Sequence, residues 1–279
     1  MKASTLIGIV LGTLAIFGSF MLEGGTFDSL WVLPAIVIVL GGTLAATLAG
    51  SSFEQFKRIP RLISIAFFPP KFEIQAIINQ IVNFSAIARR EGILGLERRK
   101  EEIKHPFLRK LLEVSIDGAD PAALLQTAET DMDFITERHL ANISLFTKMG
   151  GYSPTMGIIG TVMGLISSLA AAGSEPTVLI HHIATAFIAT MWGIFMANII
   201  WLPLGDKLRT LHSEEMQLLH VITSGVHSVQ LGETPTVVRA KLMSALPLSQ
   251  QMRMLKQSLT SSLPKQVVTA AAPAPVNQP

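Results

Sequence analysis

Four long apolar stretches, none with a charged side chain, limit the possible folds of this chain more than any other feature. A helix crosses the hydrocarbon core of a bilayer with roughly 20 apolar residues, and continuous apolar runs are typical of helices rather than of alternating barrel strands. Only 15% of the residues are charged, fewer than in an ordinary soluble domain. We therefore predict an all-α, polytopic membrane protein with four transmembrane helices, over Leu6 to Leu22, Leu30 to Gly50, Met149 to Ala172 and Val178 to Leu204.

The charges between these stretches set the predicted orientation. The link between the first two stretches carries Glu23 and Asp28 and no basic residue, whereas the segment after Gly50 is rich in basic residues: Lys57, Arg58, Arg61 and Lys71. Short cytoplasmic segments are enriched in Lys and Arg, so this segment and both termini are predicted to be cytoplasmic. The formal net charge of +2 comes from such flanks, and no basic stripe with interleaved aromatic residues indicates nucleic-acid binding.

The segments outside the four stretches are predicted to be mostly helical and cytoplasmic. Apolar residues repeat at helical spacing through Phe72 to Arg90, Pro106 begins a second helix, and the pair Asp120 and Pro121 is typical of the start of a third. The segment from Pro264 on alternates Ala and Pro, has no aromatic residue and is not expected to build a core. The predicted organisation is a transmembrane hairpin at residues 1–50, a helical cytoplasmic domain at 51–148, a second transmembrane pair at 149–205, a cytoplasmic helical region at 206–263 and a disordered tail at 264–279.

Motifs for catalysis or cofactor binding are absent from the sequence. There is no phosphate-binding loop of the Gly-Lys-Ser/Thr kind, no His-Glu-x-x-His motif and no nucleophile elbow. The chain has no cysteine, which excludes disulfides and thiolate metal sites. His181 and His182 are adjacent and would point about 100° apart on a helix, a poor arrangement for one metal ion. We expect neither an enzyme nor a resident cofactor or metal.

Two of the apolar stretches each place a threonine, Thr161 or Thr190, in a line of small residues. The small residues that share a helical face with a threonine are Gly157, Gly164 and Ser168 in one stretch, and Ala186, Gly193 and Ala197 in the other. Such residues, together with Gly160, allow two membrane helices to approach closely. Neither stretch contains a carboxylate. The pattern predicts an ion path in which both hydroxyls line the path and another chain supplies the counter-charge; the alternative is that each hydroxyl bonds a carbonyl one turn back.

Two prolines interrupt the last two apolar stretches. Pro154 and Pro203 each remove a backbone donor and leave a carbonyl unpaired, which within a membrane must face protein or water. One interpretation is a hinge beside a water-filled path. The other is that each proline marks a helix end.

Four short runs resemble motifs of the flagellar motor stator A subunits, the MotA and PomA family. The runs are GYSPTMGIIGTVMGLI at 151–166, ATMWGIFMAN at 189–198 with Pro203 and Lys207 beyond it, IVLGGTL at 38–44 and ARREGILGLE at 88–97. They occur in the family's order and extend to about Leu208. The resemblance implies a multi-pass subunit of the bacterial inner membrane that couples ion transport to flagellar rotation, and so to motility and chemotaxis.

The resemblance also implies roles for particular residues. Arg89 and Glu97 match the charged residues that engage the rotor protein FliG in this family, and Arg90 lies beside them; from sequence alone they would form a solvated surface pair. Pro154 and Pro203 match the prolines that couple ion flow to movement. The ion-binding aspartate is implied to come from a B subunit of the MotB or PomB type, surrounded by a pentameric ring of A subunits in the lipid.

Thr161 carries the prediction of which cation is used. A proton needs only a carboxylate and a chain of water, whereas sodium needs several oxygen ligands at once. In the resembled family this position is typically threonine in sodium-driven members and often alanine in proton-driven ones. Sodium is therefore favoured over the proton.

Two other functions remain as alternatives. The related ExbB and TolQ proteins energise outer-membrane processes, but they resemble three-helix proteins, and the hairpin Leu6 to Gly50 counts against them. A stand-alone ion channel or transporter would need an intramembrane charge of its own or broken helices with polar residues, and the four stretches have neither.

Overall fold

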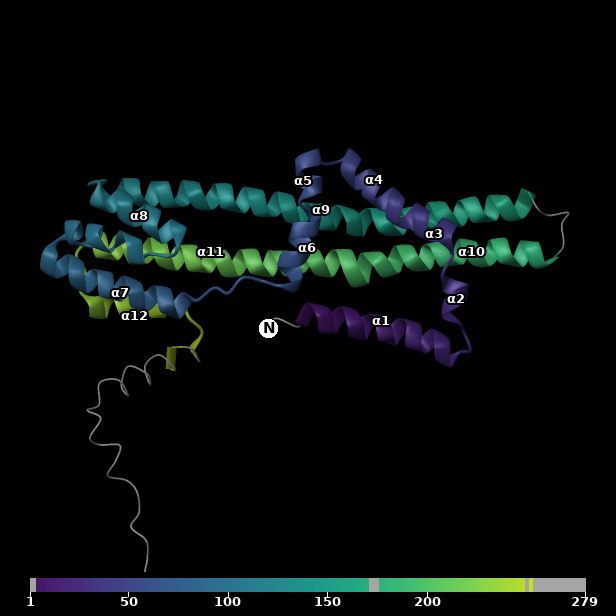
Figure 1. Ribbon diagram of the computed structural model, residues 1–279, viewed down its shortest axis with the longest axis horizontal. Helices are drawn as coiled ribbons and strands as arrows, with labels where there is room; N and C mark the ends of the chain where they lie inside the picture. Colours follow the sequence, from purple (N-terminus) through teal and green to yellow (C-terminus); the bar gives the residue numbers. More distant parts are fainter. Residues whose placement is uncertain (1–3, 171–175, 249–250, 253–279) are drawn as a thin grey trace, which may run out of the picture. The chain divides into compact units, whose positions relative to one another are not determined.

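All regular structure in residues 4–170, 176–248 and 251–252, which the computed structural model describes, is helical (Figure 1). The chain divides into two compact units. Unit 1 consists of Met1–Lys71 and Met132–Glu215, and unit 2 of Phe72–Asp131 and Met216–Pro279. The all-α prediction is confirmed for the described residues. The predicted disordered tail at residues 264–279 lies outside them, as do residues 171–175 between the last two apolar stretches.

The first apolar stretch forms α1 (Ser4–Leu22) in unit 1. Gly24, with φ of 87°, allows the chain to turn into the short helix α2 (Phe27–Leu30). Phe17 of α1 packs with Leu30 and Phe195, and the centroids of the two phenylalanine rings lie 5.1 Å apart. This aromatic cluster fixes the C-terminal half of α1 against the fourth apolar stretch.

The second apolar stretch is helical but shorter than predicted. It begins with α3 (Leu33–Ile36), continues through a π-turn, η1 (Val37–Gly41), and ends with α4 (Gly42–Ala49). Its helix Leu33–Ala49 is shorter than 18 residues and spans about 26 Å at 1.5 Å per residue. Three other helices are long and apolar enough to cross a membrane: Ser4–Leu22, Pro121–Ala170 and Pro176–Gln230. Length and composition therefore support three of the four predicted spans directly.

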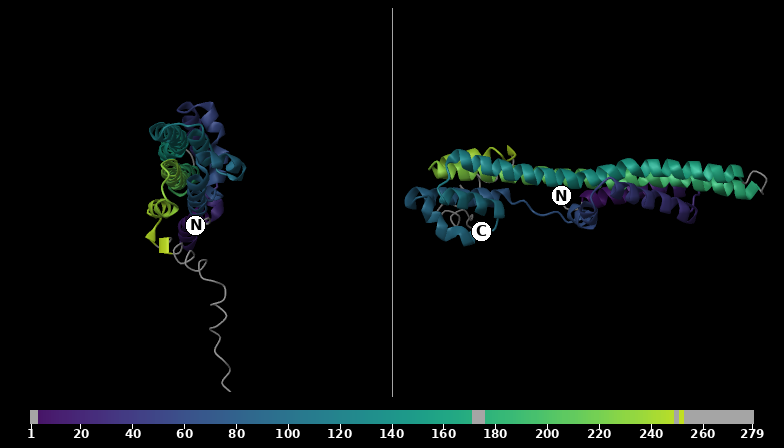
Figure 2. Two further views of the ribbon diagram at one scale, coloured as in Figure 1. Left: turned by 90° about the vertical axis from the view of Figure 1, so that its left-hand side faces the viewer. Right: turned by 90° about the horizontal axis from the view of Figure 1, so that it is seen from above.

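Two very long helices contain the last two apolar stretches. The first is α9 (Pro121–Ala170), and at its start the backbone N–H of Ala123 donates to Asp120 Oδ1 over 2.7 Å, as the predicted cap requires. The second runs through α10 (Pro176–Phe195), a π-turn η3 (Met196–Trp201) and α11 (Leu202–Gln230). Within unit 1, α9 and α10 lie side by side and antiparallel (Figures 1 and 2).

Two short helices follow the second apolar stretch in unit 1. Ser52 begins α5 (Phe53–Lys57) with a capping box, in which Ser52 and Gln55 each bond the other's backbone N–H. Pro60 lies in the first turn of α6 (Ile59–Phe67), whose buried residues Ile59, Leu62 and Ala66 lie on one face. α6 contacts α1.

Unit 2 is built from shorter helices around an aliphatic core. They are α7 (Ile74–Glu91), a 3-10 helix η2 (Ile93–Glu102), α8 (Pro106–Ile116) and α12 (Pro235–Met243), with the parts of α9 and α11 that belong to this unit. The starts predicted for α7 and α8 are confirmed to within two residues. Fully buried aliphatic side chains form its core, among them Ile78, Ile81, Leu108, Leu111 and Leu124.

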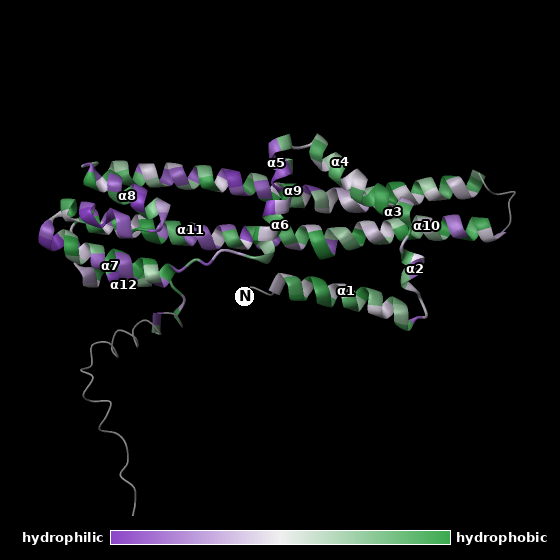
Figure 3. Cartoon of the chain, viewed as in Figure 1, coloured by the Kyte–Doolittle hydropathy of each residue, from purple (hydrophilic) through white to green (hydrophobic). Residues whose placement is uncertain are grey.

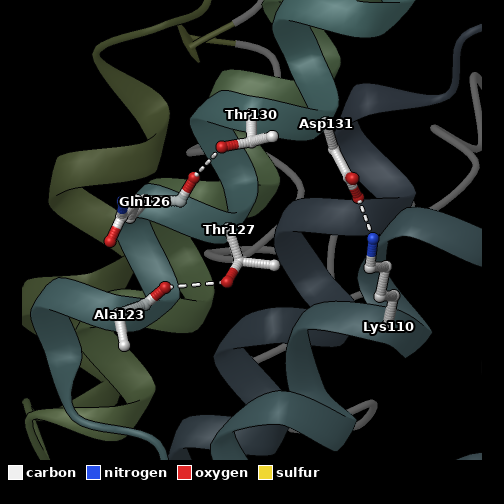
Figure 4. A network of polar contacts seen from close by, with 6 residues as sticks. All are labelled: Lys110, Ala123, Gln126, Thr127, Thr130 and Asp131. Carbon is white, nitrogen blue, oxygen red and sulfur yellow. Dashed lines mark hydrogen bonds and ion pairs between the residues drawn. The ribbon is translucent and has the colours of Figure 1, made fainter.

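Polar contacts tie the outer surface of unit 2 together. Lys110 Nζ of α8 lies 2.5 Å from Asp131 Oδ2 of α9 (Figure 4). In the same view, Thr127 and Thr130 donate to carbonyls one turn back, from Thr127 to Ala123 O over 2.8 Å. Figure 3 shows hydrophilic residues alternating with hydrophobic ones along α7 and α8, whereas α1 is almost entirely hydrophobic. Unit 2 therefore has the surface of a water-exposed domain, and α1 has that of a lipid-exposed helix.

Candidate ion pathway and charged surface

The small residues predicted to pack do bring α9 and α10 into backbone contact. A Cβ added to Gly157 would lie 2.8 Å from Ala189 O, and one added to Gly193 would lie 2.7 Å from Ser153 O. The same holds at Gly164, where an added Cβ would lie 2.8 Å from Ala186 Cβ. Gly160 contacts Ala189 and Ile38, so the second apolar stretch joins the same packing. No side chain larger than hydrogen fits at these positions unless the helices move apart.

Thr161 and Thr190 meet at this seam. Their hydroxyl oxygens are in direct contact, and Thr161 Oγ1 also lies 2.9 Å from Ala186 O and 3.1 Å from Gly157 O. Two hydroxyls and two carbonyl oxygens, all uncharged, are thus gathered around one point. The alternative prediction was a bond to a carbonyl one turn back, and Thr161 has this contact with Gly157 O. It is one of three oxygen contacts that Thr161 Oγ1 makes. Because the hydroxyl carries one hydrogen, it cannot donate to all three.

The outward faces of the seam helices are apolar. Both threonines are partly exposed, and aliphatic side chains of α9 are exposed beside Thr161, including Ile158, Val162, Met163 and Leu165. The described parts of these stretches, residues 149–170 and 176–204, contain no Asp or Glu. A hydroxyl pair on an apolar face, without a carboxylate, offers uncharged oxygen ligands but no counter-charge. It is suited to face a charged group on another chain.

Ser153 is a polar residue of the seam that the sequence reasoning missed. It lies eight residues before Thr161, so both share a helical face with Gly157 between them. Ser153 is completely buried, and its hydroxyl has no hydrogen-bond partner among the described residues. A buried polar group without a partner indicates a place for water or an ion. The eight-residue spacing was the available signal.

The two prolines lie within continuous helices. Pro154 is inside α9, and Pro203 is the second residue of α11, in the helix that runs without a break from Pro176 to Gln230. The prediction that these prolines mark helix ends is therefore wrong, because each helix extends many residues beyond its proline. Without an N–H, Pro154 leaves the carbonyl of Gly150 without its helical donor. The π-turn η3 directly precedes Pro203, so both helices have irregular backbone bonding at this level.

The charged residues predicted to face a rotor lie on the surface of unit 2. Arg89 and Arg90 are exposed in the last turn of α7, where Arg90 Nε donates to Ala86 O over 3.3 Å. Gly92, with φ of 76°, turns the chain into η2, which carries Glu97. Glu97 is 62% exposed, and its nearest basic group is Lys100 Nζ, 4.0 Å away. Arg89 and Glu97 form no ion pair with each other within the described residues, so both remain accessible to another protein.

The adjacent histidines of the sequence, His181 and His182, both lie on α10. The rings of His181 and His182 have centroids 6.3 Å apart and planes tilted by 56°. Among the residues that the structure describes, no group of three His, Asp or Glu side chains is placed to hold a metal ion.

A second histidine pair was not predicted. Nδ1 of His139 on α9 lies 3.2 Å from Nδ1 of His212 on α11, and Glu215 Oε2 lies 3.7 Å from the same His139 atom. Burial lowers the pKa of His139, and the Arg138 charge adds to this. Burial also lowers the pKa of His212, His139 lowers it further, and Glu215 acts in the opposite direction. Because the residues are 73 positions apart, no local pattern could reveal the pair.

Comparison with protein-family models gives two matches. Residues 99–221 match the MotA/TolQ/ExbB proton channel family, and residues 6–92 match the motility protein A N-terminal family. Together these matches cover the seam and Arg89 and Arg90 of the charged surface, whereas Glu97 lies in the short gap between them.

Individual proteins and solved structures agree with these matches. Motility protein A of Bacillus subtilis is 32% identical over 92% of this chain and 95% of its own length. Chemotaxis protein PomA of Vibrio alginolyticus is 29% identical, over 88% of this chain and 96% of its own. The flagellar MotAB stator complex from Bacillus subtilis matches with a TM-score of 0.85 and 32% identity, covering 90% of this chain and 98% of that chain. C. jejuni MotAB matches with a TM-score of 0.84 and 28% identity, over 89% and 97% of the two chains.

Proposed function

Because this chain belongs to the MotA/TolQ/ExbB proton channel family, and within it to the motility protein A proteins, we propose that it is the A subunit of a flagellar motor stator. In this role it couples inward cation flow across the bacterial inner membrane to torque on the rotor. The structural observation that carries the proposal is the pair of hydroxyls, Thr161 and Thr190, on a close-packed helix seam without a carboxylate. A lone channel or transporter would need its own intramembrane charge.

The missing charge implies a second kind of subunit. We propose a B subunit of the MotB or PomB type, whose aspartate faces Thr161 and Thr190. The solved neighbours support this, since both are MotAB complexes. The exposed aliphatic residues beside the threonines, such as Ile158 and Val162, give the B helix an apolar surface. Further copies of the chain would complete a pentameric ring around the B subunits.

Membrane topology follows from the same assignment. Four spans with both termini in the cytoplasm place Arg58, Arg61 and Lys207 on the inner side, as positive-inside segments should be. The second span would be the helix Leu33–Ala49, which packs against α9 where Gly42 contacts the Met156 side chain. Protein contacts of this kind support a helix that is short for a lone span.

Sodium is the cation we favour. Thr161, Thr190 and the carbonyls of Ala186 and Gly157 offer four uncharged oxygens, and a partner carboxylate would complete a set suited to a hard cation. The family description names protons, so the ion must be measured. The test is swimming speed against external sodium and against a protonophore, with the natural B subunit present.

Thr161→Ala is the variant that tests the ion site. It removes one of the two hydroxyls, and we expect the sodium dependence of swimming to weaken by about tenfold or vanish while the complex still assembles. Thr185→Ala is the matched control, because Thr185 only donates to His181 O of its own helix, over 2.9 Å. Unchanged sodium dependence in Thr161→Ala would remove the ion assignment. If the wild-type swimming speed does not depend on external sodium and falls to near zero with the protonophore, the transported cation is the proton.

Torque is proposed to pass to the rotor protein FliG through Arg89, Arg90 and Glu97. Glu97→Lys should reduce torque on tethered cells at least severalfold, with partial recovery when a complementary charge is reversed on the rotor, because facing charges fix the register of an interface. Glu101→Lys is the matched control, since Glu101 is exposed on the same 3-10 helix. Equal torque in both variants would make Glu97 an ordinary surface residue.

The ExbB or TolQ type of energiser is the remaining alternative. The match of residues 6–92 to the motility protein A N-terminal family speaks for the stator, as this segment includes the hairpin that those proteins are expected to lack. Complementation separates the two: the chain should restore motility to a strain that lacks its stator, and not outer-membrane energisation.

A further inference from the structure

A groove in unit 1 lies between the N-terminal half of α1 and the junction of η3 with α11. Its volume is about 470 Å³, and it is open to the surface. Neither the seam nor the charged surface of unit 2 accounts for it.

The groove exists because α1 packs closely along only one half. Toward its C-terminus, the Phe17 ring lies 5.8 Å from that of Trp192, and a Cβ added to Gly12 would lie 3.0 Å from Ile199 Cδ1. One turn earlier, a Cβ added to Gly8 would meet no atom within 4 Å. On the N-terminal side of Gly12, α1 therefore separates from the helix that contains Ile199. The glycine at position 8 widens the opening where a larger side chain would close it.

The lining is apolar at one end and charged at the other. Gly8, Ile9 and Ile199 form the apolar part, and Asp206 and Lys207 lie at the end predicted to be cytoplasmic. Lys207 is partly buried and forms no hydrogen bond or ion pair within the described residues. Asp206 has a contact of 3.7 Å with Arg209, but both side chains are mostly exposed, so this pair contributes little. Asn198 also lines the groove and donates one N–H to Ile194 O, leaving a second available.

We propose that this groove binds one glycerophospholipid of the cytoplasmic leaflet whose headgroup carries an ammonium as well as a phosphate. The phosphate is held by Lys207, the ammonium is held by Asp206, and an acyl chain lies along Ile9 and Ile199. The opposite charges of Lys207 and Asp206 match a zwitterionic headgroup better than an anionic one. The location of the groove also supports a phospholipid. Phosphates of the inner leaflet lie at the depth where the first charged residues of α11 follow its apolar part.

Lipid retention by the full chain tests this inference independently of the ion pathway. The purified chain, stripped of lipid, is titrated with phosphatidylethanolamine or with phosphatidylglycerol of the same acyl chains, and bound lipid is counted by native mass spectrometry. We expect one tightly held phosphatidylethanolamine and weaker phosphatidylglycerol. Lys207→Gln should weaken retention by about tenfold, since it removes a charge-assisted hydrogen bond. Arg209→Gln, which changes a neighbouring base outside the groove, should leave it unchanged.

Gly8→Leu provides a second variant that leaves the charges untouched. The leucine should fill the apolar part of the groove and abolish retention, while helicity measured by circular dichroism stays the same. Gly18→Leu is its matched control, because Gly18 also has no atom within 4 Å of an added Cβ but does not line the groove. Tighter binding of phosphatidylglycerol, or retention unaffected by both Lys207→Gln and Gly8→Leu, would overturn the proposal. The chain has no cysteine, so Ile9→Cys introduces a single cross-linking site in the groove. An efficient cross-link to a second subunit, in protein that retains no lipid, would show that the groove is a protein contact instead.

Discussion

The two units pack their helices in opposite ways. In unit 1, Gly157 and Gly193 bring two backbones together, while large aliphatic side chains such as Ile166 remain 60% exposed. In unit 2, large aliphatic side chains such as Ile81 and Leu111 are completely buried. Water drives the second arrangement, whereas lipid is as apolar as leucine and leaves membrane helices to associate through close contact. Added volume should therefore damage unit 1, and lost volume should damage unit 2.

The largest effect is expected from one added methyl group in unit 1. Gly157→Ala places a Cβ 2.8 Å from Ala189 O, which forces α9 and α10 apart and should abolish motility in soft agar. Gly151→Ala is the control, because nothing lies within 4 Å of its added Cβ, and both variants gain the same helix propensity of about 1 kcal/mol. Normal motility in Gly157→Ala, at wild-type levels of membrane protein, would contradict the close-contact account.

A smaller loss is expected from removing volume in unit 2. Leu111→Ala should lower the free energy of unfolding by about 2–5 kcal/mol, because the cavity left by a fully buried leucine collapses only in part. Leu94→Ala changes a side chain that is 63% exposed and should cost much less. The two variants are compared by thermal unfolding of the full chain in detergent, with limited proteolysis as the readout. Equal melting temperatures would show that unit 2 does not depend on its aliphatic core.

The smallest effect concerns the histidine pair of unit 1. The pKa values of His139 and His212 are lowered by folding, so the unfolded chain binds protons more readily than the folded one. Their contribution to stability is thus complete above the unfolded value of about 6.5 and is lost as the pH falls through the lower folded values. Arg138 and Glu215 are the charged groups that act on the pair.

Melting temperature measured between neutral and mildly acidic pH checks this expectation. The wild-type chain should lose stability on acidification, and His212→Gln should lose less of it. His220→Gln serves as the control, since His220 is exposed on the same helix. An identical pH dependence of the melting temperature in all three proteins would show that the His139 and His212 pair does not contribute to it.

Sequence and structure agree best where the cause is local. The cap at Asp120, the proline that begins α8 and the small residues of the seam could be read from neighbouring positions, and the structure has each of them. Nothing in the sequence distinguishes a proline inside a helix from one at its end, because the neighbouring helices decide whether the freed carbonyl is tolerated. Both interpretations of Pro154, a hinge and a helix end, therefore stayed open in the sequence.

The rest of the candidate site depends on distant partners. The mutual contact of Thr161 and Thr190 joins two helices, and the buried hydroxyl of Ser153 is recognisable only once α10 covers it. The groove beside Gly8 likewise requires knowing that α1 diverges from α11. Each involves a tertiary contact that helical periodicity alone does not specify.

The shortness of the helix Leu33–Ala49 links the proposed second span to the thickness of the bilayer. In the proposed topology its length of about 26 Å is less than the roughly 30 Å of a typical hydrocarbon core, so the membrane would thin beside it at a cost of fractions of a kcal/mol per ångström. We expect vesicles with shorter acyl chains to favour the assembled protein over those with longer ones, as reconstitution yields across a chain-length series would measure. A cell that lengthens its acyl chains then shifts the energetics of this protein without changing a single residue.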